Sequence, residues 1–125
     1  MLVHATNNLR TQNIAFYIIG KPTASDVILY YTFTQKTTLP ISLSTTQTRS
    51  QTAATGSTAF SLKKDTSGGT VTTIGTITFA ASARVGTISF TSAITFSAGD
   101  SLIMEAPSSQ DATLANIGFN IVANR

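Results

Sequence analysis

The sequence contains no cysteine, no tryptophan and a single histidine, His4. Without cysteine, the chain can form no disulfide and offers no thiolate for catalysis or metal binding. His4 lies in a polar N-terminal segment with no acidic residue near it, and no Gly-x-Ser-x-Gly nucleophile motif occurs. We therefore expect a protein that is not an enzyme and that uses no metal or cofactor.

Charged residues are scarce, with eight Lys and Arg against five Asp and Glu, for a net charge of +3. Only Lys63 and Lys64 are adjacent, so the basic stripe typical of nucleic-acid binding is missing. No segment reaches the ~18 consecutive apolar residues of a membrane span. Met1 to Arg10 also lacks the apolar core of a signal peptide. We expect neither nucleic-acid binding nor membrane insertion.

What the chain has in abundance is serine and threonine, which together supply 37 of its 125 residues. Threonine is β-branched and fits the solvated face of a sheet. A chain of this length suits a single domain and can bury roughly two thirds of its unfolded surface. A surface built on hydroxyls rather than charges is common in extracellular or assembled β-proteins.

A short pattern recurs in the second half of the chain, with Ile and Phe two residues apart across a hydroxyl. It occurs in Ile77-Thr78-Phe79, Ile88-Ser89-Phe90 and Ile94-Thr95-Phe96. In a strand, Ile and Phe then share one face and the hydroxyl lies on the other. Similar alternation marks Asp26 to Thr34, Thr58 to Lys64 and Asn116 to Val122. These patterns predict an all-β fold, an antiparallel β-sandwich of jelly-roll-like form with seven to nine strands.

The alternation also predicts which side chains form the core and where the chain bends. Gly75 interrupts the pattern because Ile74 and Ile77 differ in parity, which indicates a bulge or bend. Asp65 to Gly69 is predicted to be a hairpin loop, and Ser44 to Ser57, which has no period, is predicted to be a loop. Twelve residues are expected to be mostly buried: Val27, Leu29, Tyr31, Phe33, Phe60, Leu62, Ile77, Phe79, Ile88, Phe90, Ile117 and Phe119.

The chain divides into an N-terminal arm, residues 1–12, and one β-sandwich domain, residues 13–125. The arm has few large apolar residues and no alternation, so we expect it to become ordered by adding to a sheet edge. It would reach a neighbouring subunit or the particle, with Leu2 and Leu9 as anchors. A disordered terminus is the alternative. Asn13 to Ile19 is apolar on both faces, which predicts a strand covered on two sides, either by the core or by a partner. Tyr17 and Ile19 are candidate assembly contacts.

Few other residues are candidates for a site. Asp65, Asp100 and Asp111 lie in predicted turns, where acids usually accept turn hydrogen bonds rather than bind calcium. Tyr30 is a candidate for stacking on a sugar, with a place in the core or in a subunit interface as the alternative.

Seven short segments follow one another in a recognisable order. They are Gly20 to Ile28, Thr52 to Thr55, Phe60 to Lys64, Gly75 to Ala81, Phe96 to Asp100, Ala106-Pro107 and Asp111 to Ile117. Together they resemble a β-sandwich module that recurs in virion proteins of tailed bacteriophages and prophages. The match covers about Gly20 to Arg125. The hairpin after Lys64 departs from the module, because it carries extra residues where a tight Asn-Gly turn is typical.

The resemblance implies a function in the virion. In the proteins that it resembles, the module usually ends a longer tail or baseplate polypeptide and acts in assembly or host attachment. We expect a non-enzymatic structural virion protein, placed on the capsid as decoration or on the tail or baseplate. It would form a homo-oligomer, a trimer rather than a dimer, and bind other virion proteins. The alternative is a carbohydrate-binding attachment module in which Tyr30 contacts a host surface glycan.

Overall fold

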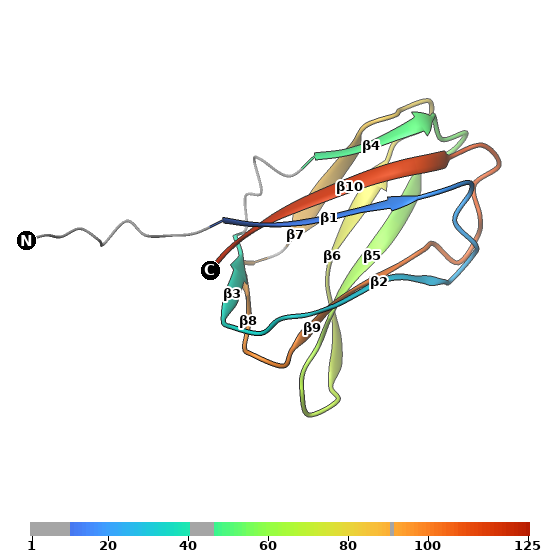
Figure 1. The fold of residues 1–125 in the computed structure, drawn as a ribbon. Coiled ribbons are helices and arrows are strands. Elements are labelled where there is room, and N and C mark those ends of the chain that lie inside the picture. The colour runs from blue at the N-terminus through green and yellow to red at the C-terminus, as the bar shows by residue number, and fades with distance from the viewer. Residues whose placement is uncertain (1–10, 41–46, 91) are drawn as a thin grey trace, which may run out of the picture.

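Residues 11–40, 47–90 and 92–125 are described by a computed structural model of the chain. Within these ranges the chain forms ten strands and no helix. The strands belong to two antiparallel sheets of five strands each, which form the two layers seen in Figure 1. The prediction of an all-β antiparallel sandwich is confirmed. The strand number is ten rather than seven to nine, and the jelly-roll winding stays a prediction.

The first sheet is organised around its longest strand, β10 (Ala115–Asn124). One side of β10 pairs along its length with β1 (Thr11–Ile18). Its other side pairs with β4 (Gln47–Thr52) and, near the C-terminus, with β3 (Thr37–Leu39). The short strand β8 (Ile94–Phe96) pairs with β3. β10 therefore holds together segments from both ends of the chain.

The second sheet has the order β2, β9, β5, β6, β7. Its strands are β2 (Val27–Thr32), β9 (Ser101–Glu105), β5 (Thr58–Asp65), β6 (Val71–Phe79) and β7 (Gly86–Phe90). The chain crosses between the two sheets from β1 to β2, from β2 to β3, from β4 to β5, and at each step from β7 to β10. Because of this repeated crossing, the two sheets share one core.

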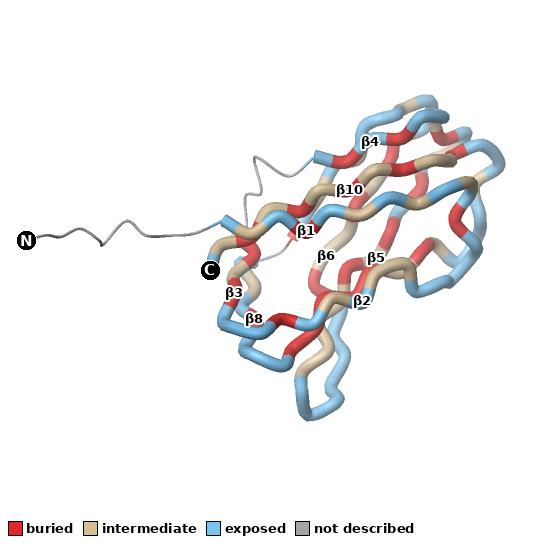
Figure 2. The backbone as a smooth tube through the Cα atoms, in the orientation of Figure 1, coloured by how far each residue is buried: buried red, intermediate tan, exposed pale blue. Residues whose placement is uncertain are grey.

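The core lies between the sheets, and buried positions alternate along the strands (Figure 2). Phe60 on β5 packs edge-to-face against Phe119 on β10, with ring centroids 5.6 Å apart, and so joins the two layers. Eight of the twelve predicted core residues are buried: Phe33, Phe60, Leu62, Ile77, Phe79, Phe90, Ile117 and Phe119. Three others, Leu29, Tyr31 and Ile88, are partly buried against them.

Val27 was predicted to be buried, and this prediction is wrong, because its side chain is 55% exposed. The cause is a bulge in β2. Val27 pairs with Glu105 and Leu29 with Met104, so Ile28 is an extra residue on β2. The bulge shifts the phase of the alternation, and Ile28 rather than Val27 packs against the core.

The segment predicted to be a loop, Ser44 to Ser57, contains strand β4. Its inward side chains are hydroxyls rather than apolar groups, since Thr48 and Ser50 are 3% and 2% exposed. The backbone around Ser50 is bonded to Arg84 in both directions, Ser50 N to Arg84 O at 2.8 Å and Arg84 Nε to Ser50 O at 3.0 Å. These bonds let a polar strand join the start of β7 and close this side of the sandwich.

The predicted hairpin is confirmed, because β5 and β6 pair as antiparallel neighbours around the loop that follows Asp65. Gly69 in this loop has a positive φ of 91°, a backbone conformation that residues other than glycine rarely adopt. The predicted irregularity at Gly75 is confirmed as well. Leu62 pairs with Gly75 and Lys63 with Thr73, so Ile74 is an extra residue on β6.

Candidate functional site

The two edge strands β1 and β2 lie on the same side of the sandwich, and Gln12 Nε2 on β1 donates a hydrogen bond to the Tyr31 hydroxyl on β2. Neither strand contains a charged residue or a proline. Natural edge strands are usually protected by charges, prolines or bulges. β2 has a bulge, but β1 pairs in unbroken register with β10. The outer edge of β1, free of all other described strands, is therefore an unprotected site for strand addition.

Exposed apolar side chains gather on this side of the molecule. The described residues include six exposed large hydrophobic side chains, of which four belong to β1, β2 or their connection. These four are Tyr17 (57% exposed), Ile19 (84%), Val27 (55%) and Tyr30 (58%). Tyr17 and Ile19 were predicted as assembly contacts, and their exposure makes them available to a partner.

The other predicted assembly contacts, Leu2 and Leu9, lie outside the described residues, as do His4 and most of the predicted arm. Thr11 and Gln12 were assigned to the arm in the sequence. They form the first two residues of β1 and pair with Asn124 and Ala123 of β10.

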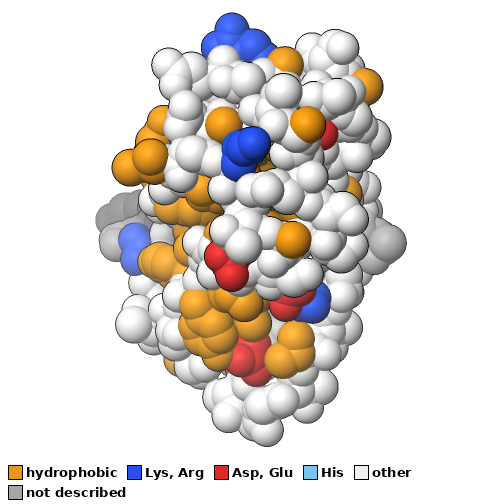
Figure 3. Space-filling view, turned by 90° about the vertical axis from the view of Figure 1, so that its right-hand side faces the viewer, with side chains coloured by type: hydrophobic (Ala, Val, Ile, Leu, Met, Phe, Trp, Pro, Cys, Tyr) orange, Lys and Arg blue, Asp and Glu red, His pale blue; other side chains and the backbone are white. Residues whose placement is uncertain are grey.

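Tyr30, the predicted glycan contact, lies on the outer face of the second sheet. Its hydroxyl donates a hydrogen bond to the Asp65 carboxylate, and this bond is the main reason that the pKa of Tyr30 is raised. Ile103, its register partner on β9, is only 6% exposed although it belongs to the same outer face. Nearby, Lys63 Nζ lies 3.0 Å from Glu105 Oε1. Figure 3 shows hydrophobic side chains beside acidic and basic ones in the lower half of the view.

The outer face of the first sheet carries a shallow depression of about 470 Å³. Two rows of paired residues form it. In one row Gly118 on β10 lies between Tyr17 on β1 and Arg49 on β4. In the next row Asn120 lies between Ala15 and Gln47, which also line the depression. Gly118 has no side chain and lies between the long side chains of Tyr17 and Arg49, which gives this surface its shape.

Gln47, Arg49, Gly118 and Asn120 were not predicted as site residues from the sequence. For Gln47 and Arg49, which belong to β4, the sequence did contain a pattern that could have indicated a shared face. Gln47, Arg49 and Gln51 alternate with the hydroxyl residues of β4, so the long polar side chains share one face. An alternation of long polar with small hydroxyl residues has the period of a strand just as an apolar alternation does.

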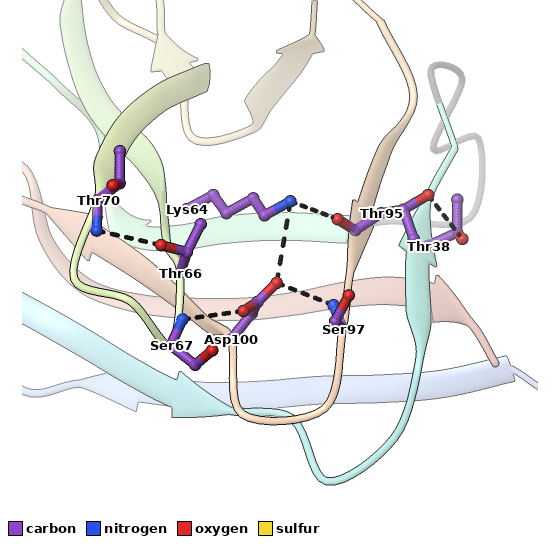
Figure 4. A network of polar contacts seen from close by, with 8 residues as sticks. All are labelled: Thr38, Lys64, Thr66, Ser67, Thr70, Thr95, Ser97 and Asp100. Carbon is purple, nitrogen blue, oxygen red and sulfur yellow. Dashed lines mark hydrogen bonds and ion pairs between the residues drawn. The ribbon is translucent and has the colours of Figure 1, made fainter.

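Asp100 acts within the fold, as predicted for a turn acid (Figure 4). Its carboxylate accepts hydrogen bonds from Ser97 N at 2.9 Å and from Ser67 N at 3.0 Å, and Lys64 Nζ lies 3.9 Å away. The backbone N–H groups of Ser97 and Ser67 lower the pKa of Asp100, against the opposing effect of burial. Asp100 thereby ties the turn before β9 to the loop of the β5–β6 hairpin.

Asp111 acts in a similar way at the other end of the sandwich. Burial raises its pKa, but four backbone N–H groups that donate to the carboxylate outweigh burial and hold the pKa well below its usual range. The donors belong to Thr55, Gly56, Thr113 and Leu114, at 2.9–3.0 Å. One side chain therefore joins the segment after β4 to the segment before β10.

We expect Asp111→Ala to lower the free energy of unfolding at pH 7 by about 1–3 kcal/mol, because the N–H groups lose their charged acceptor. A carboxyl whose pKa is lower in the folded state than in the unfolded state stabilises the fold above the unfolded pKa of about 3.9, and that stabilisation is lost as pH falls toward the folded pKa. The difference between variant and wild type should therefore be smaller at pH 3 than at pH 7 in urea denaturation.

Asp26→Ala is the matched control, since Asp26 is exposed and its side chain bonds to no described residue. It should change stability by less than about 0.5 kcal/mol at pH 7. An Asp111→Ala loss of equal size at pH 3 and pH 7 would contradict the assignment of a lowered pKa.

Within residues 11–40, 47–90 and 92–125, no group of three or more His, Cys, Asp or Glu side chains is placed to hold a metal ion. In the same residues, no helix is long and apolar enough to cross a membrane. The candidate sites of the described chain are therefore the edge of β1 and the two outer sheet faces.

No model of a known protein family matches the chain, and no curated protein matches it significantly. The resemblance to tailed-phage virion modules accordingly remains a prediction from the sequence.

Proposed function

We propose that this protein is a non-enzymatic structural protein of a tailed-phage virion. It assembles into a small homo-oligomer and docks on the surface of the particle, as capsid decoration or on the tail or baseplate. The sequence resemblance supports the place in the virion. The observation that carries assembly is the unprotected edge of β1, next to exposed Tyr17, Ile19, Val27 and Tyr30.

The edge of β1 offers a long run of backbone groups to a partner strand. β1 has eight residues, and a strand rises about 3.3 Å per residue, so the edge is roughly 26 Å long. An added strand would satisfy its outward N–H and C=O groups and would also cover Ile19. The backbone would supply most of the affinity, and the neighbouring apolar side chains would fix the register.

Two kinds of pairing are available to this side of the sandwich. Pairing of β1 with β1 of a second copy gives a two-fold dimer, whereas pairing of β1 with β2 of the next copy is head-to-tail and can close a ring. Both β1 and β2 are uncharged edges on one side of the molecule. We favour the contact between β1 and β2, because it uses both edges, and we keep the trimer that was expected from the sequence resemblance.

The double variant Asn13→Lys/Ile19→Lys should convert the oligomer to monomers. Asn13 and Ile19 are both exposed, so the two lysines fit the monomer but place charges along the contact edge. Sedimentation velocity measures the result. Val71→Lys is the control, because Val71 is exposed on β6, away from the edge, and its lysine should leave the oligomer intact. Wild-type protein that stays monomeric at millimolar concentration would contradict the proposal.

Location in the particle needs a separate experiment. Antibody labelling of intact particles, viewed by electron microscopy, should place this protein on the outer surface of capsid or tail. Its absence from purified particles by mass spectrometry would refute the virion assignment and would leave the assembly result untouched.

A second candidate is a carbohydrate-binding attachment module, and the exposed ring of Tyr30 favours it. The bond from its hydroxyl to Asp65 holds the ring in place, and the side chain is 58% exposed and so accessible to a sugar. A glycan array probed with wild type and with Tyr30→Phe and Tyr30→Ala tests this function. Binding that survives in Tyr30→Phe but is lost in Tyr30→Ala would support it, and an array without any binder would reject it.

A further inference from the structure

The depression on the outer face of the first sheet has the composition of a ligand site. Its volume, about 470 Å³, lies within the range of roughly 300–1,000 Å³ that small-molecule sites occupy. Tyr17 and Arg49 pair with Gly118 from opposite sides, so their side chains border a residue that has none. A ring-shaped ligand can therefore lie on the backbone of Gly118 between an aromatic ring and a guanidinium group.

The polar groups of the depression lack partners in the described part of the protein. The Arg49 side chain forms no ion pair or hydrogen bond with any described residue, and no acidic residue lines the depression. The buried Asn120 Oδ1 likewise accepts no hydrogen bond from the described residues. The terminal torsion of an asparagine side chain is soft, and the oxygen must rotate out of its buried position to meet a ligand. A ligand that brings a negative charge and hydroxyl groups would satisfy these unpaired groups.

We propose that this depression binds a sugar unit that carries a carboxylate, such as a uronic or sialic acid residue. Arg49 donates two parallel hydrogen bonds to the carboxylate, the geometry that guanidinium groups favour. Tyr17 packs against the apolar C–H face of the sugar ring. The amides of Gln47 and Asn120 each donate and accept, as sugar hydroxyls do.

This ligand site goes beyond the proposed assembly function and does not depend on it. Strand addition uses the backbone edge of β1, whereas the depression lies on the face of the sheet over Gly118. Of the four exposed residues named for assembly, Tyr17 alone also lines the depression. A single arginine among neutral amides fits one carboxylate. It does not provide the row of cations that a nucleic-acid backbone requires.

The site is tested by titrating the ¹⁵N-labelled full chain with glucuronic acid, and in parallel with glucose and with acetate, while amide NMR shifts are recorded. Glucose differs from glucuronic acid at the carboxylate, and acetate supplies the carboxylate alone. We expect saturable shifts at Tyr17, Arg49 and Gly118 with a dissociation constant on the order of 1 mM for glucuronic acid. Glucose and acetate should each bind at least tenfold more weakly.

Gly118→Val is the blocking variant. A Cβ at Gly118 meets no atom closer than Arg49 O at 4.0 Å, and a β-branched residue suits a strand, so the fold accepts it while the side chain fills the floor. Gly118→Val should abolish the NMR shifts that glucuronic acid causes and leave the thermal melting curve unchanged. Arg49→Gln should reduce glucuronic acid binding to the level of glucose. Lys36→Gln, which removes an exposed charge elsewhere, should bind as wild type does.

Three results would overturn the proposal: equal binding of glucose and glucuronic acid, acetate binding as strong as that of the sugar acid, or shifts that persist in Gly118→Val. Arg49→Gln keeps the test decisive if Gly118→Val does not fold, because unchanged binding in Arg49→Gln also overturns it. Loss of the oligomer in Asn13→Lys/Ile19→Lys without loss of binding would show that the two sites are separate.

Discussion

Phe79→Ala should lower the free energy of unfolding by about 3–5 kcal/mol, the cost typical of removing a buried phenylalanine side chain. Phe79 has no solvent exposure and packs edge-to-face against Phe60, with ring centroids 6.0 Å apart. Its ring also borders Gly86 on the neighbouring strand, so little can move in to fill the space. Because domains of this kind are stable by about 5–15 kcal/mol, the loss is a large share of the total.

Urea denaturation monitored by circular dichroism measures this effect, with Val85→Ala as the control for an exposed strand-side apolar residue. Val85→Ala should change stability by less than about 0.5 kcal/mol. If Phe79→Ala unfolds at the same urea concentration as the wild type, Phe79 does not lie in the core and the register of β6 is wrong.

The Ile-x-Phe segments show what could be predicted from the sequence. All three became strands, as part of β6, β7 and β8, and Phe79, Phe90 and Phe96 are all buried. The reason is geometric. Alternation fixes which face of a strand meets the core, and a shift of one residue would expose every apolar side chain. Large apolar side chains with a period of two therefore determine both the strand and its inward face.

Strand β4 shows what the same pattern could not predict. Its inward residues, Thr48 and Ser50, are hydroxyls, and burying them is favourable only where hydrogen-bond partners exist. The Ser50 hydroxyl donates to the carbonyl oxygen of Arg84, more than thirty residues away along the chain. An apolar side chain indicates burial by its chemistry alone, but a hydroxyl does so only in a particular three-dimensional setting.

The sequence predicted that Asp100 and Asp111 accept hydrogen bonds within their own turns, but it did not predict their bonds to distant segments. A local role for Asp100 and Asp111 follows from their place beside turn residues. Each also accepts bonds from a distant segment, Asp100 from Ser67 and Asp111 from Thr55 and Gly56. These longer contacts arise only once β5, β9 and β10 have taken their places in the two sheets.

The two candidate sites also differ in how far they could be predicted from the sequence. The segment with Tyr17 and Ile19 was expected to be covered on both sides, by the core or by a partner, because it is apolar on both faces. In the single chain the core leaves these two side chains exposed. The depression over Gly118 was not expected. It needs β1, β10 and β4 side by side in one register, and Tyr17 and Arg49 are far apart in sequence. A site assembled across three strands depends on pairings that no local pattern specifies.

Gly75→Ala should destabilise the protein by about 3 kcal/mol, at the upper end of what overpacking usually costs. A Cβ on Gly75 would lie 2.2 Å from Phe90 Cδ1 and 2.4 Å from Ser89 O. The ring of Phe90 can turn away, but the carbonyl oxygen of Ser89 belongs to the backbone of the paired strand β7. The β6–β7 pairing must therefore open at the bulge to admit even one methyl group.

Gly56→Ala is the matched control, because a Cβ there meets nothing within 4 Å and should leave stability within about 0.5 kcal/mol of wild type. The double variant Gly75→Ala/Phe90→Leu separates the two contacts, since Phe90→Leu removes the clash with the Phe90 ring but not the clash with the carbonyl oxygen of Ser89. Measured against Phe90→Leu alone, the added alanine should still cost more than about 1 kcal/mol. Wild-type stability of Gly75→Ala would mean that β6 does not approach β7 at this bulge.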